Sequence, residues 1–137
     1  MITRDDFFMG RDKAYKAELT PEIEANAKVT IDRANLLLAR FRQATGDTYA
    51  RKVNSAWRPA AVNAATPGAA RKSKHMLGQA IDIDDDNGAL DDWLMEPEGE
   101  QALREIGLWH EAPRDTPQWA HVQIVPPGSG NLHFYAK

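Results

Sequence analysis

Two short stretches of the sequence contain the residue types that bind metals and move protons. The first is SKHMLGQAIDID, residues 73–84, in which His75 stands seven positions before Asp82. The second is WAHVQI, residues 119–124, which places His121 within an apolar alternation. Imidazole nitrogens and carboxylate oxygens are common ligands of divalent transition metals. These three side chains would form a metal site if the fold brought them together.

The alternation around Asp82 predicts how that side chain is aimed. Residues 79–84 alternate between polar and apolar types, which is typical of a β-strand with one buried face. Ile81 and Ile83 would point into the core, and Asp82 and Asp84 would point away from it. The loop that carries His75 leads directly into this strand, and Gly78 would let its backbone turn closely.

The alternation around His121 gives the same kind of prediction. A strand over residues 119–125 would bury Ala120, Val122 and Ile124 and leave Trp119, His121 and Gln123 on the polar face. If the two strands are neighbours, His121 and Asp82 share one open face. Two imidazoles and a carboxylate there would suit a catalytic zinc site, which has three protein ligands and water in a fourth position.

Two other interpretations compete with zinc. A single histidine is more often a surface residue or a hydrogen-bonded core residue than a ligand, and periodicity alone does not exclude this. The acidic run DDDNG suggests calcium, but an EF-hand loop needs Gly at its sixth place and Glu at its twelfth. Counting from Asp82, those places hold Asn87 and Trp93, so a solvated turn is the better interpretation.

The clearest element that could support such a site is a helix from Thr20 to about Ala44. Thr20 would cap it, Pro21 suits its first turn, and Gly46 would end it. Apolar residues recur at helical spacing and predict one buried stripe. That stripe comprises Ile23, Ala27, Ile31, Ala34, Leu38 and Phe41.

The other elements are expected to be short. We predict a strand over 49–57, a short helix within AAVNAATPGAA, and a helix over 89–106 that is interrupted at residues 97–99. Two further strands are expected, at 108–111 and 119–125, and the turn PPGSG precedes a last apolar stretch, LHFY. This order predicts a single α+β domain, residues 1–137, with helices on one face of a small antiparallel sheet and the metal site on the other.

Composition restricts the possible partners. The chain has 137 residues with 17 basic and 20 acidic side chains, which gives a net charge of −3 and no basic stripe for nucleic acid. There is no cysteine, so a metal site must use His, Asp or Glu. No stretch looks like a signal peptide or a membrane span, so we expect no stable membrane insertion. We also expect a monomer.

The spacing of these residues resembles that of a known enzyme family. The pattern S-x-x-R, N, S-x-H-x-x-G-x-A-x-D-I and W-x-H-x-Q is similar to the zinc peptidases of the D-Ala-D-Ala carboxypeptidase and L-Ala-D-Glu endopeptidase family, which includes VanY-like enzymes and phage endolysins. The resemblance spans residues 55–123, about half of the chain. The matching residues are Ser55, Arg58, Asn63, Ser73, His75, Gly78, Ala80, Asp82, Ile83, Trp119, His121 and Gln123.

The resemblance implies a role for several of these residues. It implies a hedgehog-like peptidase fold and Zn²⁺ held by His75, Asp82 and His121. Arg58 would stabilise the oxyanion that forms at the substrate carbonyl, although a structural ion pair is the alternative. Ser73 and Trp119 would contact substrate, and Ser73 could equally order the loop before His75. Asp84 could orient a ligand. The substrates would be stem peptides of bacterial peptidoglycan.

The sequence departs from the family at the expected general base. Relatives commonly place Asp or Glu three residues before the last histidine, where this chain has Gln118. An amide cannot accept the proton of the attacking water. We expect Glu111, at the end of the preceding strand, to replace it, with Asp115 in the connecting loop as the second candidate. An exposed acid without a catalytic role is the alternative for both.

Two functions are therefore consistent with the sequence. The first is an endolysin-like zinc peptidase that accumulates in the host cytoplasm and acts at the bacterial cell wall. The second is a catalytically weak or inactive zinc-binding module of the same fold, such as a phage structural component or a wall-binding domain. A metal that serves only stability is a third, weaker possibility. The bond that is cut is left open.

Overall fold

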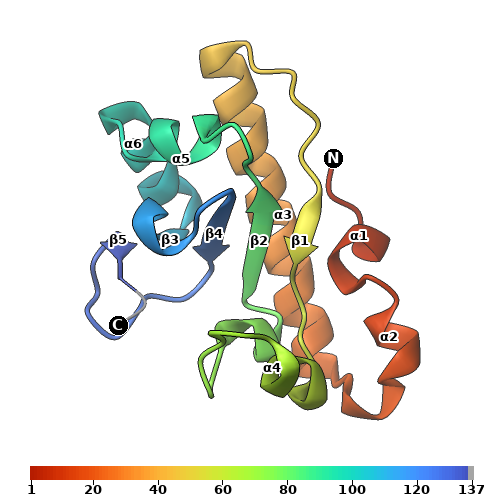
Figure 1. The fold of residues 1–137 in the computed structure, drawn as a ribbon. Coiled ribbons are helices and arrows are strands. Elements are labelled where there is room, and N and C mark those ends of the chain that lie inside the picture. The colour runs from red at the N-terminus through yellow and green to blue at the C-terminus, as the bar shows by residue number, and fades with distance from the viewer. Residues whose placement is uncertain (136–137) are drawn as a thin grey trace.

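The computed structural model describes residues 1–135, and these residues share one hydrophobic core. Five strands form a sheet in the order β1-β2-β4-β3-β5, and α3 crosses behind it (Figure 1). The helices α5 and α6 pack on the same side as α3, which confirms the α+β prediction of helices on one face. The strands are β1 (Val53–Ser55), β2 (Ala80–Asp84), β3 (Trp109–Glu111), β4 (Trp119–Gln123) and β5 (His133–Phe134).

The helices are arranged around this sheet in chain order. Two short helices precede α3, and α4 lies below the sheet in the view of Figure 1. The bounds are α1 (Arg4–Phe8), α2 (Arg11–Ala14), α3 (Pro21–Thr45), α4 (Ala60–Ala65), α5 (Ala89–Leu94) and α6 (Pro97–Ile106). Single 3₁₀ turns lie at η1 (Lys16–Glu18), η2 (Lys74–Leu77) and η3 (Pro113–Asp115). Helices α1 and α2 were not among the predicted elements.

The long helix α3 follows the sequence prediction closely. The Thr20 hydroxyl accepts a hydrogen bond from the Ile23 amide at 3.2 Å, and Gly46 ends the helix in the left-handed conformation. Most of the predicted stripe is buried, although Ile31 is only partly so. Thr30 is also buried, because its hydroxyl donates to the Gly78 carbonyl at 2.7 Å. This bond joins the loop of His75 to the helix.

Gly78 is required where that loop meets α3. Its φ is +72°, a conformation that side chains disfavour, and an added Cβ would lie 3.1 Å from the Ile23 carbonyl oxygen. The η2 turn therefore rests directly on the helix backbone. This contact fixes where the chain enters β2, and hence where His75 stands relative to Asp82.

The prediction of a helix broken at residues 97–99 was wrong in its position. The break lies at Met95 and Glu96, and Pro97 starts α6 as its first residue. Proline suits a first turn, since its missing N–H has no partner there in any case. Gly99 lies inside α6 because a Cβ at this position would come within 2.0 Å of the Trp93 carbonyl. The glycine allows α5 and α6 to pack closely.

The first strand is shorter than the predicted range 49–57, since residues 49–52 and 56–57 lie outside it. Arg51 turns inward instead, where its guanidinium pairs with Asp85 at 2.6 Å. Asp85 also accepts hydrogen bonds from the Leu90 and Asp91 amides at the start of α5. The DDDNG run is therefore more than the solvated turn that we predicted, because Asp85 is buried and its carboxylate accepts from two amides in the first turn of α5.

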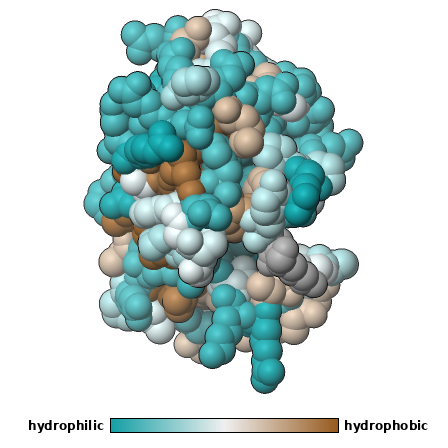
Figure 2. All heavy atoms as spheres, turned by 90° about the vertical axis from the view of Figure 1, so that its left-hand side faces the viewer, coloured by the Kyte–Doolittle hydropathy of each residue, from teal (hydrophilic) through white to brown (hydrophobic). Residues whose placement is uncertain are grey.

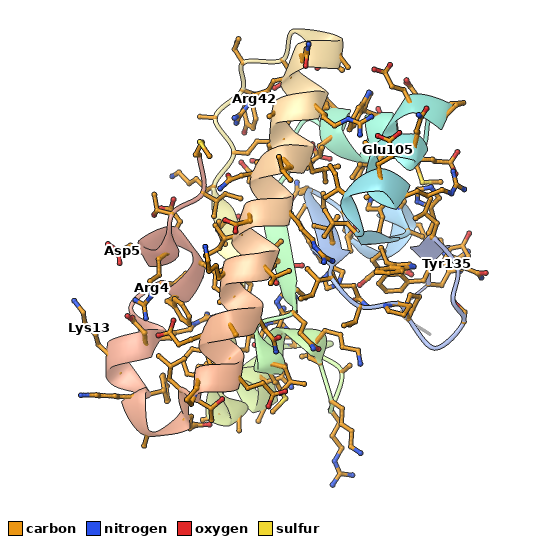
Figure 3. All side chains as sticks on the ribbon, turned by 180° about the vertical axis from the view of Figure 1, so that it is seen from behind. Arg4, Asp5, Lys13, Arg42, Glu105 and Tyr135 are labelled. Carbon is orange, nitrogen blue, oxygen red and sulfur yellow. The ribbon has the colours of Figure 1, made fainter. Side chains whose placement is uncertain are left out.

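The sheet is mostly antiparallel, with one exception. β3 and β5 run parallel, with His110 opposite His133 and Glu111 opposite Phe134. The sequence did not predict this pairing. After β4 the PPGSG turn leads the chain to the far edge of β3, so β5 does not pair with the strand that precedes it in sequence. Tyr135 lies at this edge of the molecule, as Figure 3 shows from behind.

The face that Figure 2 shows is mainly hydrophilic, with only scattered apolar residues. Within residues 1–135, no helix has both the length and the apolar character that a membrane crossing requires.

Candidate metal centre

The register of two strands brings the predicted metal ligands together. β2 and β4 pair antiparallel with Asp82 directly opposite His121. Since paired residues of neighbouring strands point to the same side, both side chains face away from α3. Possible ligand atoms of His75, Asp82 and His121 all lie within 4.8 Å of one another, and all three residues are buried. The sequence prediction that they share one place is confirmed by this geometry.

The loop before β2 sets the orientation of the His75 ring. The Ser73 hydroxyl accepts a hydrogen bond from the His75 amide at 3.2 Å, which starts the η2 turn. The ring Nδ1 lies 2.7 Å from the Ala56 carbonyl oxygen, which can only accept. Nδ1 therefore carries the proton, and Nε2 keeps its lone pair. This Nε2 faces Asp82 Oδ2 at 3.3 Å.

Gln123 holds the His121 ring through Nε2, whereas the His75 ring is held through Nδ1. The Gln123 amide nitrogen donates to the Val125 carbonyl at 2.9 Å, so its Oε1 is the atom that faces His121 Nε2, also at 2.9 Å. His121 therefore donates from Nε2, and its Nδ1 points to Asp82 Oδ1 at 2.8 Å. Fixing a ligand's tautomer through its other nitrogen is a common feature of metal sites.

This arrangement requires positive charge between the three side chains. Two ring nitrogens with lone pairs face one carboxylate, and such groups repel unless a proton or a cation lies between them. Although burial opposes a charged ring, the hydrogen bond to Asp82 raises the pKa of His121 above its ordinary value. Burial lowers the pKa of His75, which leaves that ring neutral and able to act as a ligand. The donor set of two nitrogens and one carboxylate fits zinc.

Asp82 remains ionised within this cluster. Burial alone would raise its pKa, but the neighbouring imidazoles of His75 and His121 outweigh burial and bring the pKa well below its usual range. The carboxylate is therefore available as the single anionic ligand. A cation held there would carry net positive charge, which is what polarisation of a carbonyl requires.

Arg58 lies beside the cluster and is held on three sides. Its Nε donates to Ser55 Oγ at 3.0 Å and its Nη2 to Asp82 Oδ2 at 3.2 Å. Asn63 accepts from Nη1 at 3.4 Å and donates to the Ala70 carbonyl at 2.9 Å. The serine and asparagine of the sequence pattern thus position the arginine, a role that spacing alone did not show. Burial lowers the Arg58 pKa, yet guanidinium groups stay protonated in proteins.

The cluster opens into a cleft of about 460 Å³. One wall is the small-residue loop 66–70, and the other carries Glu111, Asp115 and Trp119. Arg58 and the three candidate ligands also line it. This volume lies within the range of small-molecule and peptide sites, roughly 300–1,000 Å³. The predicted contact residue Ser73 is not among the lining residues, since its hydroxyl caps the His75 turn instead.

Glu111 lies in the cleft on the strand next to His121. The β3–β4 register pairs His110 with Val122, which places the following residue, Glu111, level with His121. Burial raises the pKa of the Glu111 carboxyl above its ordinary value. A carboxylate with a raised pKa beside a cation site has the properties of a proton carrier.

The other acid positions behave differently. Gln118, at the place of the family's usual acid, is exposed, has a positive φ of 74°, and does not line the cleft. Asp115 ends the η3 turn and does line it. Asp84 accepts hydrogen bonds from the Tyr49 hydroxyl and the Asp86 amide, and no contact with the candidate ligands is seen within residues 1–135. The suggestion that Asp84 orients a ligand gains no support.

Two contacts of the site had no sequence signal beyond residue type. The Ala56 carbonyl fixes His75, and any residue could supply that oxygen. Phe134 packs edge-on against His121, with ring centroids 5.9 Å apart. The position of Phe134 in the apolar stretch LHFY predicted that it is buried, but not that it contacts His121.

Comparison with known proteins gives one finding. A family model described as Peptidase M15 matches residues 14–106, more than half of the chain. The matched stretch includes Arg58, His75 and Asp82, whereas Glu111 and His121 lie beyond it, so their place in the site depends on the sheet geometry. No curated protein and no solved structure gives a significant match.

Proposed function

The chain belongs to the peptidase M15 family, and we propose that it is a zinc-dependent peptidase that cleaves peptides of bacterial peptidoglycan. One observation carries the proposal. In their neutral forms, His75 and His121 carry the ring proton on the nitrogen that faces an acceptor, so His75 Nε2 and His121 Nδ1 are left to bind a metal, and both face the Asp82 carboxylate beside Arg58 in an open cleft. A purely structural cluster would have no need of this opening.

His75, Asp82 and His121 would hold the zinc ion. When bound, zinc supplies Lewis-acid polarisation of the scissile carbonyl and of the attacking water. Arg58 would hold a guanidinium N–H toward the carbonyl oxygen as negative charge develops there. Its bonds to Ser55 and Asn63 set this direction before substrate arrives.

Glu111 would move the protons. One of its carboxylate oxygens would accept a proton from the attacking water, and the same group would then donate it to the nitrogen of the leaving amine. The position at the end of β3 favours Glu111 over Asp115, since a strand end is held more firmly than a loop. Its raised pKa fits a group that must both accept and release a proton.

The choice of substrate rests on the resemblance to cell-wall peptidases. Stem peptides carry free carboxylates and D-amino acids, and a cleft lined by Arg58 and small residues would accept an extended peptide of that kind. An endolysin-like enzyme that accumulates in the host cytoplasm and acts as a monomer at the wall is the setting that the resemblance implies.

The second candidate is a zinc-binding module that recognises wall peptides without cleaving them. Gln118 at the usual acid position favours it. In this module the cleft, Arg58 and the metal would bind peptide, and Glu111 would have no role in turnover.

One experiment separates the two. Zinc-loaded protein is incubated with purified peptidoglycan, and new amino groups are counted over time. The enzyme predicts release that a chelator abolishes and Glu111→Gln nearly abolishes. Glu98→Gln serves as the matched control, because Glu98 is an exposed acid on α6. Tight binding of peptidoglycan without any new amino groups would establish the module instead.

A further inference from the structure

A second group of titratable side chains lies on the helix side of the sheet, away from the metal centre. His110 on β3 is fully buried, and its Nε2 lies 2.6 Å from Asp91 Oδ1 of α5. Its Nδ1 lies 3.0 Å from the Nδ1 of His133 on β5. The Nε2 of His133 reaches Glu100 Oε2 of α6 at 3.2 Å. Four side chains thus form one continuous chain of contacts.

The geometry of this chain allows few proton arrangements. Two Nδ1 atoms at 3.0 Å make a hydrogen bond only if one carries a proton and the other does not. Glu100 is a carboxylate that accepts, so His133 donates to it from Nε2. If His133 is neutral, its Nδ1 then accepts from His110, and Nε2 of His110 accepts in turn from a protonated Asp91. Each contact between neighbouring groups then has one donor and one acceptor.

The surroundings of Asp91 support this direction. Burial, followed by the nearby charges of Asp85 and Asp92, raises the pKa of Asp91 to about 8 despite the opposing effect of Arg51. Burial also lowers the pKa of His110 to about 4, so this ring is neutral near pH 7. Burial, with repulsion from His110, lowers the pKa of His133, although Glu100 opposes this. A protonated acid followed by two neutral rings satisfies all of these conditions.

This chain of hydrogen bonds attaches β5, a strand that would otherwise be weakly held. β5 has only two residues, and its bonds to β3 run from the His110 amide to Leu132 O at 2.9 Å and from the Ala112 amide to Phe134 O at 2.6 Å. Strands this short are not stable by themselves. The His110–His133 contact joins the same two strands through their side chains and joins both to α5 and α6.

The residues next to this contact face the metal centre. Side chains alternate along a strand, so His110 and His133 point to the helices while Glu111 and Phe134 point to the cleft side. Glu111 lines the cleft, and Phe134 packs against His121. A shift of β5 relative to β3 would move both from their places.

We propose that Asp91, His110, His133 and Glu100 form a directional hydrogen-bond chain that docks β5 and thereby positions Glu111 and Phe134 at the metal centre. His110 and His133 are positioning residues here, because they act through their neighbours and do not touch the cleft. The effect on cleavage depends on the proposed peptidase activity. The docking of β5 does not, and it is tested separately.

The first test is spectroscopic and uses the intact protein. Long-range proton–nitrogen spectra of the ¹⁵N-labelled chain at pH 7 report the tautomer of each histidine ring. We expect His110 protonated at Nδ1 and His133 protonated at Nε2. Two rings protonated only at Nε2 would overturn the proposal, since no proton would then lie between the Nδ1 atoms. A doubly protonated His133 would overturn it too, because His133 would then donate to His110 and the hydrogen bond between the two rings would run in the opposite direction.

The second test removes one link. His133→Phe keeps a ring but loses both hydrogen bonds, and we expect the His110 and Ala112 amides to exchange with solvent at least about tenfold faster, since the loss of even one such bond implies a change of about that size. The Ile124 amide, which donates to Gln79 O in another part of the sheet, should be unaffected. Asp91→Asn should preserve protection, because its amide can donate to His110 as the protonated acid does. Unchanged exchange in His133→Phe would contradict the proposal.

The activity of the same variants completes the design. His133→Phe should lower kcat by about tenfold with little change in KM, since it displaces Glu111 rather than a binding group. Ser129→Ala, which removes a loop hydrogen bond from the Asn131 amide, is the control and should leave both exchange and kcat unchanged. Faster exchange in His133→Phe with kcat unchanged would show that β5 docks through the chain but does not position the site, and would overturn that half of the proposal. If even the wild-type protein releases no amino groups, the proposed function fails while the exchange result still decides the docking.

Discussion

Asp82 and His121 stand opposite each other on β2 and β4, and the carboxylate lies 2.8 Å from the one ring nitrogen that Gln123 leaves without a proton. The metal centre is therefore built into the rigid middle of a sheet and not into loops. Only His75 comes from a turn, and Gly78 and Ser73 fix that turn to its surroundings. Substitutions can test the contacts that orient each ring as well as the ligands themselves.

Replacing Gln123 should weaken metal binding without removing a ligand. In Gln123→Ala, His121 Nε2 loses its acceptor, and the ring is free to adopt the tautomer that blocks Nδ1. We expect a loss of about 10–100-fold in zinc affinity, the usual effect of losing such a partner. Competition with a chromogenic chelator measures it. Equal affinity in Gln123→Ala and the wild type would mean that Gln123 does not set the His121 tautomer.

Arg58→Lys should reduce turnover more than binding of the metal. An ammonium group cannot contact Ser55, Asn63 and Asp82 together in the way that the guanidinium does. If Arg58 stabilises the oxyanion, kcat should fall by roughly 10²–10³, the range for losing one such donor. Steady-state cleavage of a stem peptide gives kcat, and chelator competition gives the zinc affinity. A normal kcat in Arg58→Lys would leave Arg58 with a structural role only.

The pH dependence of cleavage should follow Glu111. The carboxyl must be ionised to accept a proton, and burial raises its pKa above the ordinary value of 4.5. Activity should therefore be low in acid and rise through a pKa higher than 4.5. In Glu111→Gln the little activity that remains should lack this rise. If Asp115→Asn removes it and Glu111→Gln does not, Asp115 is the proton carrier.

Periodicity predicted the parts of the site that lie within regular strands. The alternation in residues 79–84 and 119–124 has only one arrangement that buries its apolar side chains, so the facing of Asp82 and His121 followed directly. The capped, amphipathic α3 was predictable for the same reason. In each of these elements, local pattern and burial agree.

The parts that were not predicted depend on partners distant in sequence. Arg51 shortens β1 because it meets Asp85, thirty-four positions later. β5 pairs parallel with β3 through only two residues, which is too few for a pattern. The Ala56 carbonyl that orients His75 is a backbone atom and has no signature at all. Single contacts of this kind decide the tautomers of a site, and residue spacing does not contain them.

The buried Asp91 should make stability depend on pH in an unusual direction. Its pKa is about 8 in the folded protein and near 3.8 when exposed. Between these values the folded chain binds a proton that the unfolded chain releases, so stability from this group is complete below about pH 4 and is lost as pH rises through 8. One such group changes the free energy of unfolding by at most about 1.4 kcal/mol per pH unit.

The comparison for Asp91 is the Asn variant. Asp91→Asn imitates the protonated acid and cannot ionise, so the difference in unfolding free energy between variant and wild type should grow from pH 5 to pH 8 in favour of the variant. Urea denaturation at a series of pH values measures it. A constant difference across this range would show that Asp91 does not hold its proton.

Gly78→Ala should destabilise the fold and the metal centre together. An alanine at φ +72° costs about 1–2 kcal/mol, and its Cβ would also lie 3.1 Å from the Ile23 carbonyl. Relief of that contact would move η2 away from α3 and carry His75 with it, so zinc affinity should fall along with stability. Gly68→Ala is the matched control, because Gly68 has a similar φ of +75° but open space around it. It should lose comparable stability and keep its zinc affinity. If both variants bind zinc equally well, the contact between Gly78 and α3 does not set the position of His75.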